Sequence, residues 1–197
     1  MKKFLKIFVI CFVSIFIFSL ITNVITMNVN YAKNKKLWAD YGENLIYSQK
    51  KCPNVSFGFG SMSKNGCAAT CVYNVLLMEN RYTPMPEIIK KFDLYGEIFF
   101  GFLGTDPFAF ISIFQSYGFK VNTYLNSNEF NDYAKKSKYA IVMTVSTSGG
   151  HFQLMTNYNE QDNSYTCYVP YYKQTMQGLF KEKSCKNSFI KILYTIN

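Results

Sequence analysis

The sequence predicts an α+β fold with two segregated lobes, a helical N-terminal lobe and an antiparallel β-sheet C-terminal lobe. Between residues 67 and 116, apolar side chains recur at the spacing of buried helices. From residue 139 onwards, apolar and polar residues alternate as they do in strands. Helices followed by a run of strands are typical of an α+β domain. A hydrophobic content of 49% and an aromatic content of 18% are ample for one packed core.

The N-terminal segment, residues 1–32, is predicted to be a signal or membrane-anchor segment. Three lysines lie in the first six residues, and the next 21 residues, Ile7 to Met27, carry no charge. At 1.5 Å per residue, such a helix spans roughly 30 Å, which matches a bilayer core. The weak cleavage option at Ala32 leaves a secreted form open. We therefore expect a single-pass protein of the cell membrane with its domain outside the cytoplasm, or a secreted domain if the segment is cleaved.

The positive charge of the chain is concentrated beside this segment. The formal net charge is +9, from 21 basic and 12 acidic residues. Six of the basic residues lie within residues 1–36, so the rest of the chain carries 15 basic and 12 acidic residues, a net charge of +3. This balance gives little support to nucleic-acid binding. We expect a monomer that contacts the membrane and a peptide or protein substrate.

Residues 33–44 are predicted to be a linker, and residues 45–197 to be the folded domain. Within the domain we expect a central helix from Cys67 to Met78, and a second helix opened by Pro84 and Pro86. Asp106 is expected to cap a third helix that begins at Pro107. The remaining expected elements are a strand over 119–124, a polar helix over 127–137, and strands over 139–146, 151–158, 164–169 and 189–196.

Five of the six cysteines lie outside the apolar segment, and an odd number in an exported chain suggests one free thiol. If Cys67 is that thiol, the other four (Cys52, Cys71, Cys167 and Cys185) allow three pairings, between which the sequence does not choose. Cys167 and Cys185 lie in or near neighbouring predicted strands and are our tentative pair. Full burial or bridging of all five is the alternative. The chain holds one histidine and no C-x-x-C spacing, so we expect no metal site and no cofactor.

Cys67 and His151 are the candidate catalytic residues. Cys67 follows a glycine-rich loop and begins the central helix, where unpaired backbone N–H groups and the helix dipole favour a thiolate. His151 follows Gly149-Gly150 at the start of a predicted strand, 84 residues later. An imidazole beside a thiol can hold its proton and so make the sulfur a nucleophile.

Several short motifs, taken in order, resemble a papain-like cysteine peptidase. They are Asn65-Gly66-Cys67-Ala68-Ala69-Thr70, Gly104-Thr105, Phe114-Gln115-Ser116-Tyr117-Gly118 and Gly150-His151-Phe152. The chain is most similar to the bacteriocin-processing (double-glycine leader) peptidase-like group, over about residues 45–196. The resemblance implies a papain-like fold, with Cys67 as nucleophile and His151 as general base and acid, and hydrolysis of peptide or amide bonds through a thioester.

Two positions depart from the pattern of this group. Val169 stands where an aspartate or asparagine would orient the histidine, with Asn157, Asp162 or a backbone carbonyl as substitutes. Ser61 stands six residues before Cys67, where a glutamine would serve the oxyanion hole. Ser61 and Gln49 are therefore the candidate oxyanion donors beside the backbone N–H of Cys67. The departures leave two alternatives open: a catalytically impaired papain-like domain that binds a peptide or cell-wall ligand, and a cell-wall amidase.

Overall fold

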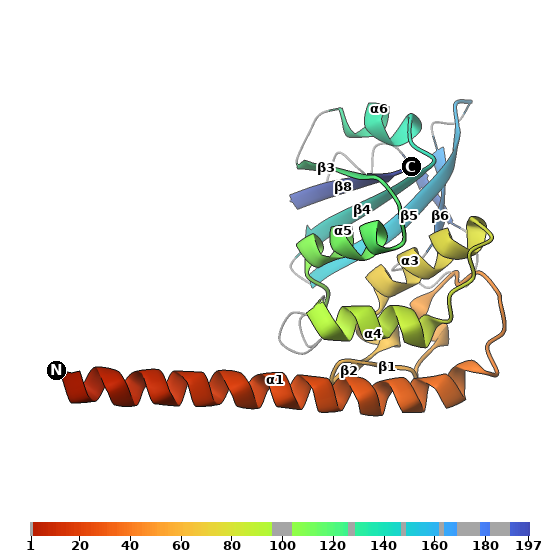
Figure 1. The fold of residues 1–197 in the computed structure, drawn as a ribbon. Helices are drawn as coiled ribbons and strands as arrows, with labels where there is room; N and C mark the ends of the chain where they lie inside the picture. The colour runs from red at the N-terminus through yellow and green to blue at the C-terminus, as the bar shows by residue number, and fades with distance from the viewer. Residues whose placement is uncertain are drawn as a thin grey trace.

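The computed structural model describes residues 2–95, 104–125, 129–146, 149–161, 164–168, 178–181 and 190–197. Figure 1 shows three layers above a long N-terminal helix: helices α3, α4 and α5, then a twisted sheet, then the short helix α6 on the far side of that sheet. The predicted α+β fold, with a helical lobe followed by an antiparallel sheet, is confirmed.

The helices are α1 (Lys2–Trp38), α2 (Met62–Asn65), α3 (Cys67–Met78), α4 (Met85–Tyr95), α5 (Pro107–Ser116) and α6 (Phe130–Lys135), with a 3₁₀ turn η1 over Gln49–Lys51. A small sheet pairs β1 (Ser56–Phe57) with β2 (Gly60–Ser61). The described residues of the main sheet form six antiparallel strands in the order β3-β8-β4-β5-β6-β7. They are β3 (Val121–Leu125), β4 (Tyr139–Ser146), β5 (Gly149–Asn159), β6 (Ser164–Tyr168), β7 (Gly178–Lys181) and β8 (Ile190–Ile196).

Helix α1 is longer than the sequence suggests. From Phe4 to Trp38 it has the length and the apolar composition of a membrane-spanning helix. It does not stop at residue 32 but continues through residues 33–38, the first part of the expected linker. The N-terminal half projects away from the domain, while the C-terminal part runs along α4 and β1 (Figure 1).

The docked part of α1 buries one face at helical spacing. Met27, Asn30, Asn34 and Trp38 are each no more than 8% exposed. The Asn30 side chain donates a hydrogen bond to the carbonyl of Gly58 at 2.7 Å. The Trp38 ring stacks on Tyr41 and meets Tyr73 of α3 edge to face. This packing explains why polar residues continue the helix where a linker is expected.

Helix α3 forms the centre of the domain, as its sequence predicts. Its residues from Cys67 to Leu76 are all buried. The predicted cap of α5 is confirmed, because the Asp106 carboxylate accepts the N–H of Phe108 at 2.9 Å and Pro107 is the first helical residue. Strand β4 has the bounds that alternation predicts, and β3, β5, β6 and β8 differ from the expected strands by one or two residues.

The two faces of the sheet pack against different layers. One face packs with α3, α4 and α5 in the larger core; its sheet residues include Ile141, Phe152, Leu154, Tyr194 and Ile196. The other face packs with α6; its sheet residues are Ala140, Val142, Met155, Tyr165 and Leu193. This alternation along β4 and β5 is the expected consequence of the two-residue period of a strand.

Two residues just after α3, Glu79 and Arg81, contact the sheet lobe. Glu79 forms a 2.6 Å salt bridge with Lys138 and accepts a 2.5 Å hydrogen bond from the Tyr139 hydroxyl. Lys138 and Tyr139 together hold the pKa of Glu79 below its usual range. The Arg81 guanidinium lies 5.0 Å from the centre of the Phe119 ring. The two lobes are therefore fastened on the side away from the start of α3.

Candidate active site

Cys67 is the first residue of α3, directly after Gly66. The first backbone hydrogen bond across this turn runs from the N–H of Thr70 to the carbonyl of Gly66. The N–H groups of Cys67 and Ala68 precede it, and both lower the pKa of the Cys67 thiol. This is the arrangement expected at a helix N-terminus, where the first N–H groups have no partner within the helix.

Gly66 fixes the approach of the chain to Cys67. A Cβ at this position would lie 2.7 Å from the Met62 carbonyl oxygen and 2.9 Å from its Cα, both backbone atoms of α2. No other residue type fits without moving α2 or the start of α3. The glycine before the cysteine is therefore explained by close packing of the backbone, since its φ of −87° is open to any residue.

His151 lies on β5, and its neighbour Phe152 is in contact with the Cys67 thiol. His151 is 9% exposed and pairs with Thr144 of β4. The backbone N–H of Phe152 donates a hydrogen bond to the Cys67 sulfur. The structure thus brings the first residue of α3 against β5 at the residue that follows His151. The catalytic pairing of the two side chains stays a prediction.

Burial and hydrogen bonding act in opposite directions on the Cys67 thiol. Burial is the largest influence and raises its pKa above the ordinary value of 9.0. The backbone N–H groups of Phe152, Ala68 and Cys67 lower it, because each donates to the thiolate form. The thiol is only 7% exposed. Burial outweighs the three donors, so these surroundings alone keep the thiol protonated near neutral pH.

The structure gives Gln49 a different role from the one expected. Its side-chain nitrogen donates to the carbonyls of Ser63 at 3.2 Å and Lys64 at 3.1 Å. Both protons of that amide are then used to hold α2, and the amide oxygen is buried without a partner. Gln49 therefore offers an acceptor, and no donor remains for an oxyanion. Ser61 ends β2, and its hydroxyl is 2.9 Å from the Ser63 hydroxyl.

The residues expected to orient His151 are only partly described. Val169 and Asp162 lie outside the described residues. Asn157 is six residues further along β5, roughly 20 Å away at 3.3 Å per residue, so its amide cannot reach the imidazole. Its φ of +50° belongs to the irregularity where the pairing of β5 with β6 shifts.

The other cysteines form no bridge with Cys67. Cys52, Cys67 and Cys71 are buried free thiols. Cys71 is one turn along α3, and burial raises its pKa well above the ordinary value, with further upward contributions from Cys67 and Cys167. Cys185, half of the tentative pair with Cys167, lies outside the described residues. Within the described ranges, no group of three His, Cys, Asp or Glu residues is arranged to hold a metal ion.

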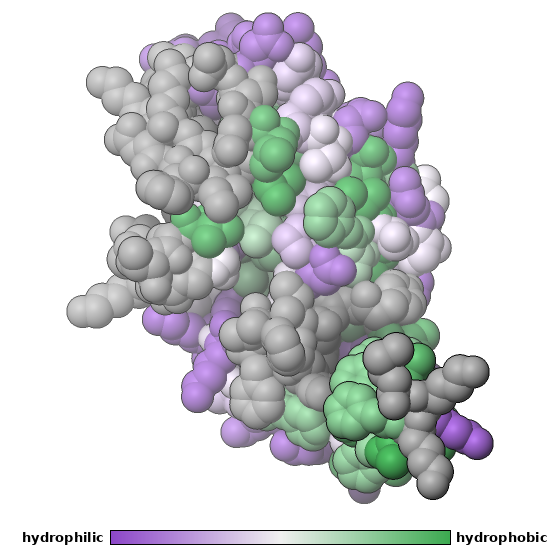
Figure 2. Space-filling model, turned by 90° about the vertical axis from the view of Figure 1, so that its left-hand side faces the viewer, coloured by the Kyte–Doolittle hydropathy of each residue, from purple (hydrophilic) through white to green (hydrophobic). Residues whose placement is uncertain are grey.

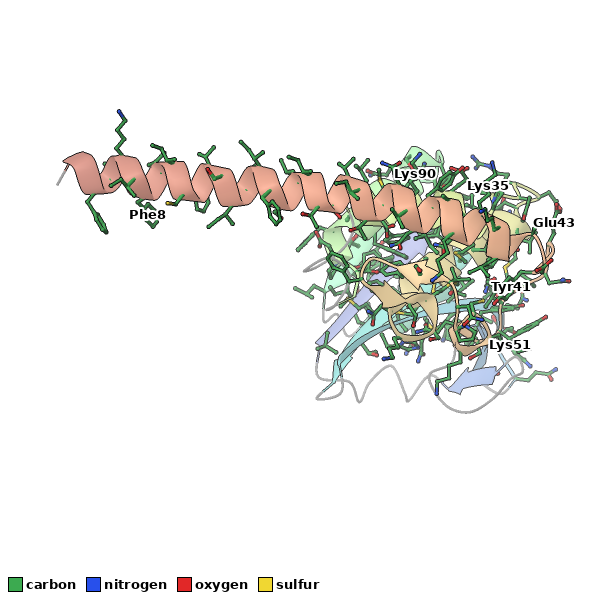
Figure 3. All side chains as sticks on the ribbon, turned by 90° about the horizontal axis from the view of Figure 1, so that it is seen from below. Phe8, Lys35, Tyr41, Glu43, Lys51 and Lys90 are labelled. Atoms are coloured by element: carbon green, nitrogen blue, oxygen red, sulfur yellow. The ribbon has the colours of Figure 1, made fainter. Side chains whose placement is uncertain are left out.

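A pocket of about 330 Å³ lies between the C-terminal end of α1 and the start of α4, away from these residues. Lys35 and Glu43 line it, and Figure 3 shows both at that end of α1. Neither Cys67 nor His151 contributes to its walls. The candidate active site is therefore defined by the contact between α3 and β5 rather than by this pocket.

Comparison with solved structures gives the same fold. The peptidase domain of Streptococcus ComA, a bi-functional ABC transporter involved in a quorum-sensing pathway, matches with a TM-score of 0.53 and 10% identity, over 68% of this chain and 91% of that one. A double glycine motif protease from an AMS/PCAT transporter, in complex with its leader peptide, matches with a TM-score of 0.47 and 14% identity, over 66% of this chain and 82% of that one. No protein-family model and no curated protein matches the chain. The match to the ComA peptidase domain shows the papain-like fold that the motifs suggest.

One part of the site has no signal in the sequence. The Phe152 N–H meets the Cys67 sulfur through packing of α3 on β5, and no local spacing encodes that contact. The hydrogen bonds from Gln49 to α2 also have no local sequence signal, because they join residues 14 and 15 positions apart.

Proposed function

We propose that the chain is a membrane-anchored or exported cysteine peptidase-like protein that cleaves peptide or amide bonds through a thioester on Cys67. The observation that carries the proposal is the position of the Cys67 thiol. It lies on the first turn of a buried helix, in hydrogen-bond contact with the backbone next to His151. The papain-like fold supports this assignment but does not by itself establish an activity.

Each residue has a defined role in the proposed reaction. His151 takes the proton from the Cys67 sulfur, and the thiolate attacks the carbonyl carbon of the scissile bond. The N–H groups of Cys67 and Ala68, which now face the sulfur, donate to the oxygen as it gains negative charge. His151 then protonates the leaving amine, and water releases the acyl group from the thioester.

The proposed location follows from α1. Its apolar part is exposed along the projecting half, where Phe8 lies far from the domain (Figure 3). Exposed apolar side chains over this length suit a lipid bilayer and not water. We place the domain outside the cytoplasm, held by α1 as a single-pass anchor, with release into the medium if α1 is cleaved.

The burial of Cys67 favours one alternative, a catalytically impaired domain of the same fold that binds a peptide or cell-wall ligand. Burial alone raises the pKa of the thiol, so nucleophilic attack depends on the charge that His151 supplies. If His151 is not held beside the sulfur, the site keeps its shape but loses its nucleophile.

Alkylation of the full-length protein in detergent tests the proposal. An ordinary thiol with a pKa near 8.5 is about 3% thiolate at pH 7, so a thiolate held by His151 should react up to roughly 30-fold faster with iodoacetamide. We expect fast labelling of Cys67, located by peptide mass spectrometry, and slow labelling of buried Cys52 and Cys71. Substitution His151→Ala should remove the advantage, whereas Thr144→Ala, at the paired position of β4, should keep it.

Two results would refute the catalytic pair. One is equal and slow labelling of Cys67 in the wild type and in His151→Ala. The other is cleavage of a peptide library that persists in Cys67→Ala. Peptide binding without cleavage in the wild type would instead support the impaired domain.

A further inference from the structure

The direction of α4 relative to α1 places one end of the domain beside the membrane segment. The start of α4, at Pro84 and Pro86, shares a pocket with Lys35 and Trp38 near the end of α1. Further along α4, the Lys90 ammonium lies 4.7 Å from the centre of the Tyr31 ring; Figure 3 shows Lys90 beside α1. The two helices therefore run antiparallel, and the C-terminal end of α4 points towards the N-terminal half of α1.

This pairing sets the height of Leu94 relative to the apolar segment. Leu94 is four residues beyond Lys90, about 6 Å along the helix axis. Four residues back from Tyr31 on α1 is Met27, where the apolar part of the uncharged run that begins at Ile7 ends. Leu94 is 53% exposed. An exposed leucine thus lies level with the end of this apolar stretch of α1.

One end of the strands of the main sheet lies at the same end of the molecule. Leu125 of β3 pairs with Ile192, Ile192 with Met143, and Met143 with Phe152. These residues form one row across four strands. The C-terminal end of β3 and the N-terminal end of β5 therefore lie at the same end of the sheet. Figure 1 shows the end of α4, the start of α5 and the end of β3 on the side from which α1 projects.

Exposed apolar residues of the domain gather at this end. Beyond α1, the described residues include four exposed large apolar side chains: Phe59 at 46%, Leu94 at 53%, Phe108 at 78% and Leu125 at 65%. Phe108 lies in the first turn of α5. Phe59 follows Gly58, whose carbonyl binds Asn30, three residues past Met27. Figure 2 views the molecule from this side, with apolar residues in green above the projecting end of α1.

We propose that this face, defined by Phe59, Leu94, Phe108 and Leu125, rests on the lipid surface, with its apolar side chains in the interfacial layer. The proposal rests on the membrane span proposed for α1. Because α1 enters the domain without a break, the bilayer lies directly beneath the end from which it projects. Two exposed Phe and two exposed Leu side chains are unfavourable in water, whereas the same side chains gain by entering the interface.

The orientation also bears on the substrate of the proposed peptidase. Phe152 belongs to the row of paired residues that ends at Leu125, and His151 precedes Phe152 along β5. The start of β5 therefore faces the membrane side. The site is then best placed to receive a polypeptide at the bilayer surface. An example is a substrate protein's segment that lies just outside that substrate's membrane-spanning helix.

Quenching of tryptophan by brominated lipid tests the lipid contact. The full-length protein is reconstituted into phosphatidylcholine vesicles whose acyl chains are brominated near the headgroup. The chain's one tryptophan, Trp38, is 11 residues past Met27, about 16 Å along α1, and buried, so its emission is an internal reference. Variants Phe108→Trp and Leu125→Trp report on the face. The control Gln161→Trp is at the exposed turn after β5, at the opposite end of that strand.

We expect emission from Phe108→Trp and Leu125→Trp to fall in brominated relative to unbrominated vesicles, while wild type and Gln161→Trp stay unchanged. Equal emission from all four proteins, with the protein still retained by vesicles after an alkaline carbonate wash, would overturn the lipid contact and leave the anchor in place. Release by carbonate would overturn the anchor and the lipid contact together. Iodoacetamide labelling of Cys67, measured in detergent, would still decide the peptidase proposal separately.

Discussion

Asn34 is expected to hold α1 on the domain, and its loss should be costly. Its side chain is completely buried and binds both backbone groups of Ser56: it donates to the carbonyl at 2.9 Å and accepts the N–H at 2.8 Å. Substitution Asn34→Ala removes both bonds and leaves two buried backbone groups of β1 without partners. Each such group costs about 1–3 kcal/mol, so we expect a loss of about 2–6 kcal/mol in the free energy of unfolding.

The assay is thermal unfolding of the full-length protein in detergent micelles, followed by circular dichroism. For a domain of this size, 1 kcal/mol corresponds to about 2–4 °C, so Tm should fall by roughly 4–24 °C. Asn28→Ala is the matched control, because Asn28 is exposed and bonds only to the Val24 carbonyl of its own helix. It should change the unfolding free energy by no more than about 0.5 kcal/mol. Equal melting of both variants would refute the rigid docking of α1.

Three further variants or conditions test the surroundings of the site. Gly66→Ala should cost about 1–3 kcal/mol and slow Cys67 alkylation, since its Cβ meets the Met62 backbone at 2.7 and 2.9 Å; unchanged labelling would contradict this. Gln49→Glu should lower the free energy of unfolding by about 2–4 kcal/mol, because a carboxylate would face the two carbonyls that the amide now binds. A variant of unchanged stability that cleaves peptides more slowly would instead support an oxyanion role for Gln49. Burial raises the pKa of Cys52 from 9.0 to about 11, so its contribution to stability is complete below pH 9 and disappears as pH rises through 11. Tm should therefore fall between pH 9 and 11, and less so in Cys52→Ala.

The main elements could be predicted because each carries a local physical signal. Asp106 followed by Pro107 is a cap and a first helical residue, and the structure shows both roles. The alternating side chains of residues 139–146 predict the bounds of β4, because successive side chains of this strand point to opposite faces of the sheet. One face packs with α3 to α5 and the other with α6. Cys67 begins α3 because Gly66 allows the chain to turn against α2.

The elements that could not be predicted are short or depend on distant partners. Strands β1 and β2 have two residues each, too few to show a period. Asn30 in the predicted anchor segment and Asn34 in the predicted linker give no sign of burial, because amides are usually exposed. Only the backbone of β1 and the following turn explains their burial. Glu79 similarly looks like a solvated charge until Lys138 and Tyr139 are placed beside it.

The chemistry of Cys67 depends on a balance that only the folded protein defines. A helix start favours the thiolate, and the backbone of Cys67 and Ala68 lowers the pKa of the sulfur, as does the Phe152 N–H of β5. The same packing that delivers the Phe152 N–H also removes water from the thiol, and that loss has the larger effect on its pKa. Hydrogen bonds alone therefore do not ionise Cys67 near neutral pH, and a cation at the sulfur is required. In the proposed peptidase His151 supplies that charge, so His151→Ala should move the onset of Cys67 alkylation to higher pH, where a buried thiol ionises.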